Sequence, residues 1–193
     1  MNRHIREKLS DTVKINEQFA RSTRIDSDLI EQSGFIYSES IDTFLGTLIK
    51  HQLSSKQSAY TWTGPYGSGK STLALSLNSV LMGDAKARKQ AAKKYKQDTA
   101  ENLWKAFPPG KNGWEIISLV GGKGNLEDLV KRALIAEGIL KSKDIPENSK
   151  GLELQELIIS AVETRLNDQE TYGGLILFVD EMGKLLEAAS EGD

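Results

Sequence analysis

The residue types best suited to chemistry stand in one glycine-rich run, Gly-Pro-Tyr-Gly-Ser-Gly-Lys-Ser. Glycines allow the chain to curl until successive backbone N–H groups point at one anion, and a following helix adds the positive end of its dipole. The lysine supplies a cation for phosphate oxygens, and the serine supplies a hydroxyl ligand for Mg²⁺. The spacing predicts a phosphate-binding loop formed by Gly64, Pro65, Tyr66, Gly67, Ser68, Gly69, Lys70 and Ser71, with Thr72 near the α-phosphate.

An acidic pair, Asp180-Glu181, directly follows the apolar run Leu175 to Val179. The run predicts a buried strand whose end presents Asp180 to a metal ion. Glu181 stands where a general base that deprotonates an attacking water is expected. A strand that ends in two acids is common, so the pair takes its meaning from the glycine-rich loop. Together the motifs predict Ser71 and Asp180 as metal ligands, and Lys70 and Glu181 as catalytic residues.

Strand and helix patterns flank both motifs. Aromatic and β-branched residues predict a first strand over 58–63, which the loop follows. Leucine and valine at helical spacing predict a helix over 73–81, and Gly83 is a natural stop. A second strand is predicted over 114–120, and a helix over 126–140. The predicted loop therefore lies between a strand and a helix, as its chemistry requires.

The last part of the chain repeats this alternation. A helix is predicted over 152–166 and leads into the strand 175–180. That strand is apolar on both faces, which is typical of the middle of a parallel sheet covered by helices. The chain thus predicts an α/β layered fold, with an N-terminal helical segment over 1–57 and the main domain over 58–193.

Composition narrows the classes of protein. The 193 residues are 38% hydrophobic and 27% charged, which is typical of a globular domain and not of a disordered chain. There is no cysteine, so disulfides, thiolate catalysis and cysteine-based metal sites are excluded. No apolar run approaches the length of a membrane span, and the first residues lack the apolar block of a secretory signal. We therefore expect a cytoplasmic protein that does not enter a membrane.

With these motifs the chain resembles P-loop NTPases, in the branch whose metal-binding aspartate is followed by a catalytic glutamate. That branch includes AAA+, STAND and ABC ATPases, and the absence of a Leu-Ser-Gly-Gly-Gln signature favours an AAA+ or STAND-like domain. The resemblance implies a three-layer fold with a parallel sheet, and ATP with Mg²⁺ rather than GTP. The stretch Val179 to Glu187 also resembles large prokaryotic ATPases associated with phage defence. AAA+ proteins often hold adenine upstream of the loop, which here would involve Ile36 and Tyr37.

Proteins of this branch carry further strands after the acidic one, with a polar sensor residue and an arginine finger. One of those strands usually lies between the loop strand and the acidic strand. This sequence stops at Asp193, so we expect the N-terminal piece of a longer ATPase. C-terminal domains or a partner protein would then supply the sensor and the finger, and the resemblance is compatible with a homo-oligomer.

The expected function is ATP binding and Mg²⁺-dependent hydrolysis, coupled to conformational change in a larger protein. One alternative is a switch that holds ATP without turnover, and a second is a small-molecule kinase. Gly121 to Gly124 is interpreted as a strand-to-helix turn with Asn125 as the helix cap, and a nucleotide or subunit contact is the alternative.

One segment of the chain is strongly basic although the net charge is −2. Lys86 to Lys96 contains six cations without an acid, on an alanine-rich background that favours a helix. Such a run could contact nucleic-acid phosphates. The favoured interpretation is a solvated helix face, because Tyr95 is the only interleaved aromatic residue.

Overall fold

The computed structural model describes residue 25 and residues 36–122, 125–146, 151–167 and 171–190. Most of the predicted N-terminal helical segment, residues 1–24 and 26–35, lies outside the described residues. The described elements, in chain order, are α3 (Glu39–Ser55), α4 (Lys70–Leu81), α5 (Ala85–Ala92), α6 (Gln97–Ala106), β1 (Glu115–Val120), α7 (Leu126–Ala136), the 3₁₀ turn η2 (Ser142–Asp144), α8 (Leu152–Leu166), β2 (Leu175–Asp180) and α9 (Met182–Ser190).

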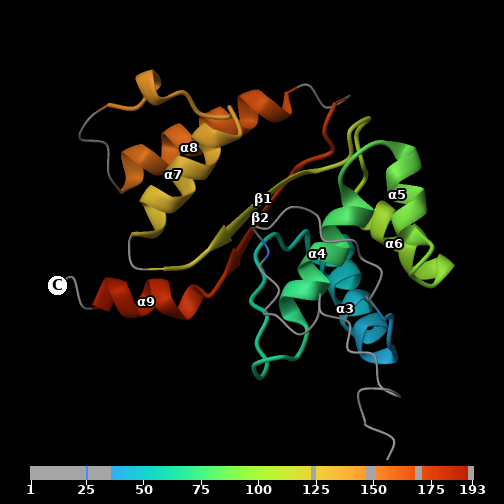
Figure 1. Cartoon of the computed structure of the whole chain (residues 1–193). Helices are drawn as coiled ribbons and strands as arrows, with labels where there is room; N and C mark the ends of the chain where they lie inside the picture. The colour runs from blue at the N-terminus through green and yellow to red at the C-terminus, as the bar shows by residue number, and fades with distance from the viewer. Residues whose placement is uncertain (1–24, 26–35, 123–124, 147–150, 168–170, 191–193) are drawn as a thin grey trace, which may run out of the picture.

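The two strands form a parallel pair at the centre of the molecule (Figure 1). Their register runs from Glu115 opposite Leu175 to Val120 opposite Asp180. Both strands lie where the sequence predicts them, and their parallel direction confirms an α/β arrangement. Because the strands are parallel and Val120 pairs with Asp180, both strands finish at the same end of the sheet. The residues that follow these two positions are therefore neighbours in space.

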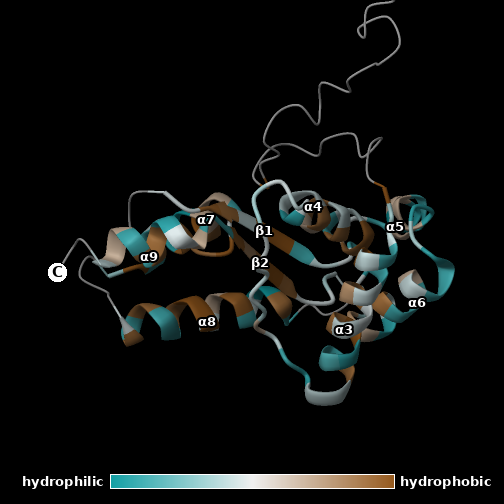
Figure 2. Ribbon diagram, turned by 90° about the horizontal axis from the view of Figure 1, so that it is seen from below, coloured by the Kyte–Doolittle hydropathy of each residue, from teal (hydrophilic) through white to brown (hydrophobic). Residues whose placement is uncertain are grey.

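Helices cover both faces of this strand pair (Figure 1). Side chains alternate along each strand, so that Ile117 and Leu119 face α7 and α8, while Ile116 faces the other way. The second face packs on α3, α4 and α6, whose fully buried residues include Leu45, Leu77 and Leu103. Figure 2 shows the strands as a hydrophobic band between the helices. The strand pair therefore separates two apolar cores.

The predicted first strand is wrong. Residues 56–65 form no strand or helix, and local bonds replace sheet pairing: the Tyr60 hydroxyl donates to the Gln57 carbonyl at 2.7 Å, and Gln57 Nε2 donates to the Ala59 carbonyl at 2.9 Å. The Trp62 ring instead packs edge-on against Phe178 of β2, at 5.6 Å between ring centroids. A segment with strand-forming side chains becomes a strand only where a partner backbone pairs with it, and no described strand does so here.

The predicted central position of the strand 175–180 is likewise not seen. Among the described residues β2 has one neighbouring strand, β1, so its other edge is unpaired. Leu177 is 40% exposed, although Leu175 and Val179 on the same face of the strand pack against the core formed with α7 and α8. The described part of the chain therefore leaves some of the apolar surface of β2 uncovered.

The helices predicted over 73–81, 126–140 and 152–166 are present as α4, α7 and α8, although α4 begins three residues earlier, at Lys70. The Asn125 side chain caps α7 by accepting from the Glu127 N–H at 2.8 Å, as predicted, but α7 ends at Ala136 before Gly138, whose φ is +68°. The basic segment forms no single helix. It breaks between α5 and α6, where Tyr95 is buried and its hydroxyl bonds to Ser76 of α4.

Among the described helices, none is both long enough and apolar enough to cross a membrane.

Candidate functional site

The glycine-rich loop leads directly into α4 and leaves the start of that helix open. Gly67 and Gly69 have φ values of +76° and +83°, which residues other than glycine rarely adopt. Gly69 is the residue immediately before the first helical position of α4. No side chain caps α4, and its first turn contains no acid. The first backbone N–H groups of a helix have no partner within the helix, so this end of α4 is suited to hold an anion.

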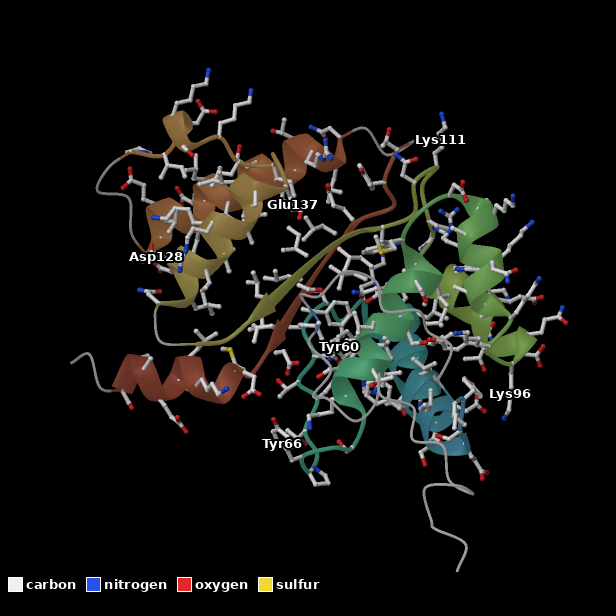
Figure 3. All side chains as sticks on the ribbon, viewed as in Figure 1. Tyr60, Tyr66, Lys96, Lys111, Asp128 and Glu137 are labelled. Carbon is white, nitrogen blue, oxygen red and sulfur yellow. The ribbon has the colours of Figure 1, made fainter. Side chains whose placement is uncertain are left out.

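The loop itself is exposed, and Tyr66 projects from its tip with 87% of its surface accessible (Figure 3). Lys70 Nζ bends back over the loop and donates to the carbonyl oxygens of Gly64 at 3.0 Å and Pro65 at 3.1 Å. Lys70 forms no ion pair with any residue in the described ranges. Its charge is therefore held beside the open helix start and is not neutralised there by an acid.

Ser71 joins the loop to the acidic pair. Its Oγ donates to Asp180 Oδ2 at 2.8 Å, although the two residues are 109 positions apart in the chain. The other carboxylate oxygen, Oδ1, accepts from the Glu181 N–H at 2.9 Å, which fixes the orientation of the Asp180 side chain. The structure thus brings the two predicted metal ligands into direct contact, at the start of α4 and the end of β2.

Glu181 occupies the sharp turn between β2 and α9. Its φ is +56°, a left-handed conformation that costs a non-glycine residue roughly 1–2 kcal/mol. Such strained residues cluster at functional sites, where neighbouring structure holds them in place. The carboxylate is directed onto α9, with Oε2 3.2 Å from Lys184 Nζ in an exposed ion pair. Lys184 is not predicted as a site residue from the sequence. Its position three residues after Glu181 at the start of a helix would have indicated the ion pair, because residues at that spacing are neighbours.

Gly121 also lies against the acidic pair. Its N–H donates to the Asp180 carbonyl at 2.8 Å, and a Cβ atom at this position would come within 2.4 Å of the Glu181 carbonyl oxygen. The sequence favours a strand-to-helix turn over Gly121 to Gly124, of which residues 123 and 124 lie outside the described residues. The parallel register explains the contact, because Gly121 and Glu181 follow paired strand ends.

The oxygen donors fit a magnesium ion that is bound together with phosphate. Within the described ranges no three His, Asp or Glu side chains gather into a metal-binding group, and the site offers only Ser71 and Asp180. Mg²⁺ commonly keeps several waters and takes one or two protein oxygens plus phosphate oxygens of the substrate. The pair therefore suits Mg²⁺ with a phosphate ligand and not a cation held by protein alone.

Tyr37 belongs to a different network, at the junction of α3 and α6. Its hydroxyl donates to Asp42 and lies 3.2 Å from Thr99 Oγ1, which donates to the same carboxylate at 2.7 Å, and its ring meets Tyr95 edge-on at 5.3 Å. Burial and the neighbouring Asp42 carboxylate raise the pKa of Tyr37 to about 12. Ile36 is 81% exposed. The adenine contact of these two residues stays a prediction, while Tyr37 has a structural role of its own.

The chain matched no protein-family model, no curated protein and no solved structure. What the site can do therefore follows from its own geometry.

Proposed function

We propose that this protein binds ATP through residues 64–72 and hydrolyses it with Mg²⁺, within a three-layer P-loop NTPase fold. The observation that carries the proposal is the 2.8 Å contact between Ser71 and Asp180. It joins two sequence motifs that lie 109 residues apart and that no short-range constraint forces together. An accidental glycine-rich turn would not be expected to place its serine on the one acid that ends an apolar strand.

The binding role of each residue follows from its surroundings. The open N–H groups at the start of α4 and the Lys70 ammonium would hold the phosphates, since both are positive and neither is neutralised by an acid in the described structure. Ser71 and Asp180 would hold the metal ion. When bound, Mg²⁺ neutralises charge on the phosphate oxygens and so favours attack at phosphorus. ATP is chosen over GTP because the family resemblance implies it.

Glu181 is the proposed general base. Its carboxylate accepts a proton from water as the water oxygen bonds to the γ-phosphorus, and the bond from that phosphorus to the β,γ-bridging oxygen breaks. ADP and inorganic phosphate leave, and the proton passes from Glu181 to solvent. The carboxylate must first leave Lys184, which is inexpensive because an exposed ion pair is worth less than about 1 kcal/mol.

A slow nucleotide switch is the second candidate, and the arginines favour it. Each arginine in the described ranges is bound away from the loop: Arg88 to the carbonyls of Gly83 and Lys111, Arg132 to that of Asp128, and Arg165 to the Glu115 carboxylate. An arginine that stabilises the transferred phosphate accelerates such reactions by about 10³–10⁵. We therefore propose that rapid turnover requires an arginine and a sensor residue from elsewhere, in further domains or a partner protein.

Titration calorimetry with ATP and MgCl₂ tests the binding role of the loop. Lys70→Ala should weaken ATP binding at least about tenfold, the effect of losing roughly 1.5–3 kcal/mol of charged hydrogen bonding. Lys50→Ala removes an equally charged side chain from the exposed face of α3 and should bind as the wild type. Equal affinity of both variants and the wild type would contradict the proposal. Phosphate release by the bound protein then separates the ATPase from the switch.

A further inference from the structure

The basic segment resolves into two groups of cations with different roles. Arg88 is 7% exposed and donates to backbone carbonyls of Gly83 and Lys111, so it holds the fold together. Lys96 pairs with Asp42 at 2.7 Å, which ties α6 to α3, and Lys94 is half-buried. The remaining three cations, Lys86, Lys89 and Lys93, are exposed. These three, with Gln90, are hereafter the α5 lysine face.

The α5 lysine face is continuous. Lys86, Lys89 and Lys93 follow at intervals of three and four residues, which places them on one side of a helix. Lys93 immediately follows α5 and keeps helical dihedral angles, with φ −60° and ψ −17°. The side chains of Lys86, Lys89, Gln90 and Lys93 line a shallow open groove together with Ala85. None of the three lysines pairs with an acid or donates a side-chain hydrogen bond to a residue in the described ranges.

This arrangement is unfavourable for the isolated protein. Solvated helix faces usually interleave acids with bases, because opposite charges three or four residues apart attract and like charges repel. Here Lys86 and Lys89, and then Lys89 and Lys93, are like-charged neighbours. The start of α5 is already capped by the Asp84 carboxylate, which accepts from the Ala87 N–H at 2.8 Å, so the unfavourable contribution is the repulsion among the three lysines. A polyanion would offset that repulsion.

We infer that the α5 lysine face binds the sugar–phosphate backbone of nucleic acid, independently of base sequence. The three cations span about 10 Å of helix axis at 1.5 Å per residue. Lysine side chains are long and mobile, so each of the three cations is expected to contact one phosphate of a strand that crosses the face. Lysine suits such contacts as a mobile point charge, and the absence of aromatic side chains from the face favours backbone contact over base stacking.

The face lies apart from the proposed ATP site. α5 lies at the right-hand edge of the molecule in Figure 1 and follows the C-terminal end of α4. The loop and the end of β2 meet at the opposite, N-terminal end of α4. Lys96 marks the same edge in Figure 3. The inference therefore needs no nucleotide bound at the loop, and it can be tested without ATP.

Fluorescence anisotropy of a labelled duplex of about 20 base pairs, titrated with the full chain, tests the inference. The triple variant Lys86→Gln, Lys89→Gln and Lys93→Gln removes the face. The matched control is Lys50→Gln with Lys141→Gln and Lys143→Gln, which removes the same total charge from exposed positions elsewhere. Lys50 lies on α3, Lys141 precedes η2, and Lys143 lies within η2. Circular dichroism of each variant confirms that it is folded. A single strand of the same length separates a preference for duplex from backbone binding in general.

Three phosphate contacts predict a slope of log affinity against log salt of about −2.7, so wild-type affinity should fall about 40-fold between roughly 50 and 200 mM KCl. The α5 variant should lose most of this salt dependence and bind more weakly at low salt, while the control follows the wild type. Absence of wild-type binding, equal weakening of both variants, or an unchanged α5 variant would each overturn the inference. So would equal or tighter binding of a polyglutamate peptide of the same charge, which would indicate an acidic protein partner.

Discussion

The Ser71 hydroxyl donates a 2.8 Å hydrogen bond to Asp180 Oδ2, and this contact joins the first turn of α4 to the last residue of β2. Hydrogen bonds to carboxylate oxygens belong to the stronger class of protein hydrogen bonds. Because Asp180 Oδ1 is held by the Glu181 N–H, neither carboxylate oxygen is free to turn away. The two ligand oxygens proposed for Mg²⁺ are thereby positioned before any ligand binds.

Loss of either partner should remove the metal dependence of ATP binding. We expect Ser71→Ala and Asp180→Ala to weaken binding of ATP with Mg²⁺ at least about tenfold, and to leave binding in excess EDTA nearly unchanged. Ser142→Ala and Asp144→Ala make the same changes at exposed positions of η2 and should behave as the wild type. Titration calorimetry with and without Mg²⁺ gives the comparison. A site variant whose affinity falls equally in both conditions would argue against metal binding there.

The junction of α3 and α6 should respond to acid. Hydrogen bonds from Lys96, Thr99 and Tyr37 hold the pKa of Asp42 well below its usual range. The folded protein therefore binds fewer protons at this position than the unfolded chain, so Asp42 stabilises the fold above about pH 4 and loses that contribution as the pH falls further.

Urea unfolding between about pH 7 and pH 2 should show a shallower acid-induced loss of stability in Asp42→Asn than in the wild type. Near neutral pH the variant should be the less stable of the two, and the two curves should converge at the acid end. Asp144→Asn, on exposed η2, should keep the wild-type slope. Parallel curves for Asp42→Asn and the wild type would show that the network contributes no pH-dependent stability.

Local patterns were sufficient to predict most of the elements. The helix over 152–166 and the parallel strand over 175–180 agree with the structure because amphipathic spacing and apolar runs are properties of the segment itself. The contact between Ser71 and Asp180 follows from two motifs with known spatial roles. The adenine contact of Tyr37, the ATPase activity and the larger parent protein stay predictions.

What the sequence missed depends on distant parts of the chain. Residues 58–63 have strand-forming side chains, but a strand requires a partner backbone, and Trp62 packs on Phe178 without one. The break in the basic segment depends on Tyr95, whose burial against α4 no local pattern indicates. The left-handed φ of Glu181 is set by the turn from β2 into α9, and glutamate gives no signal for it.

Gly121 should be intolerant of a side chain because of the acidic pair. A Cβ at this position would lie 2.4 Å from the Glu181 carbonyl oxygen, whereas a Cβ on Gly122 would meet nothing within 4 Å. We expect Gly121→Ala to displace the end of β2, destabilise the fold by about 1–3 kcal/mol and reduce ATP turnover. Gly122→Ala should be neutral or slightly stabilising. Urea unfolding and phosphate release, measured on both variants, test the difference, and equal behaviour would show that the strand ends can separate without cost.

Glu181 should matter for turnover and not for binding. Glu181→Gln keeps the shape of the side chain but cannot accept the water proton, so we expect ATP affinity close to that of the wild type and phosphate release lowered by about 10²–10⁴. The substitution also removes the ion pair with Lys184, which is 3.2 Å long in the wild type. Lys184→Ala breaks the same pair and leaves the carboxylate in place, so it should retain turnover or increase it. If both variants lose turnover equally, the ion pair and not the carboxylate would be the important feature, and Glu181 would have no role as a base.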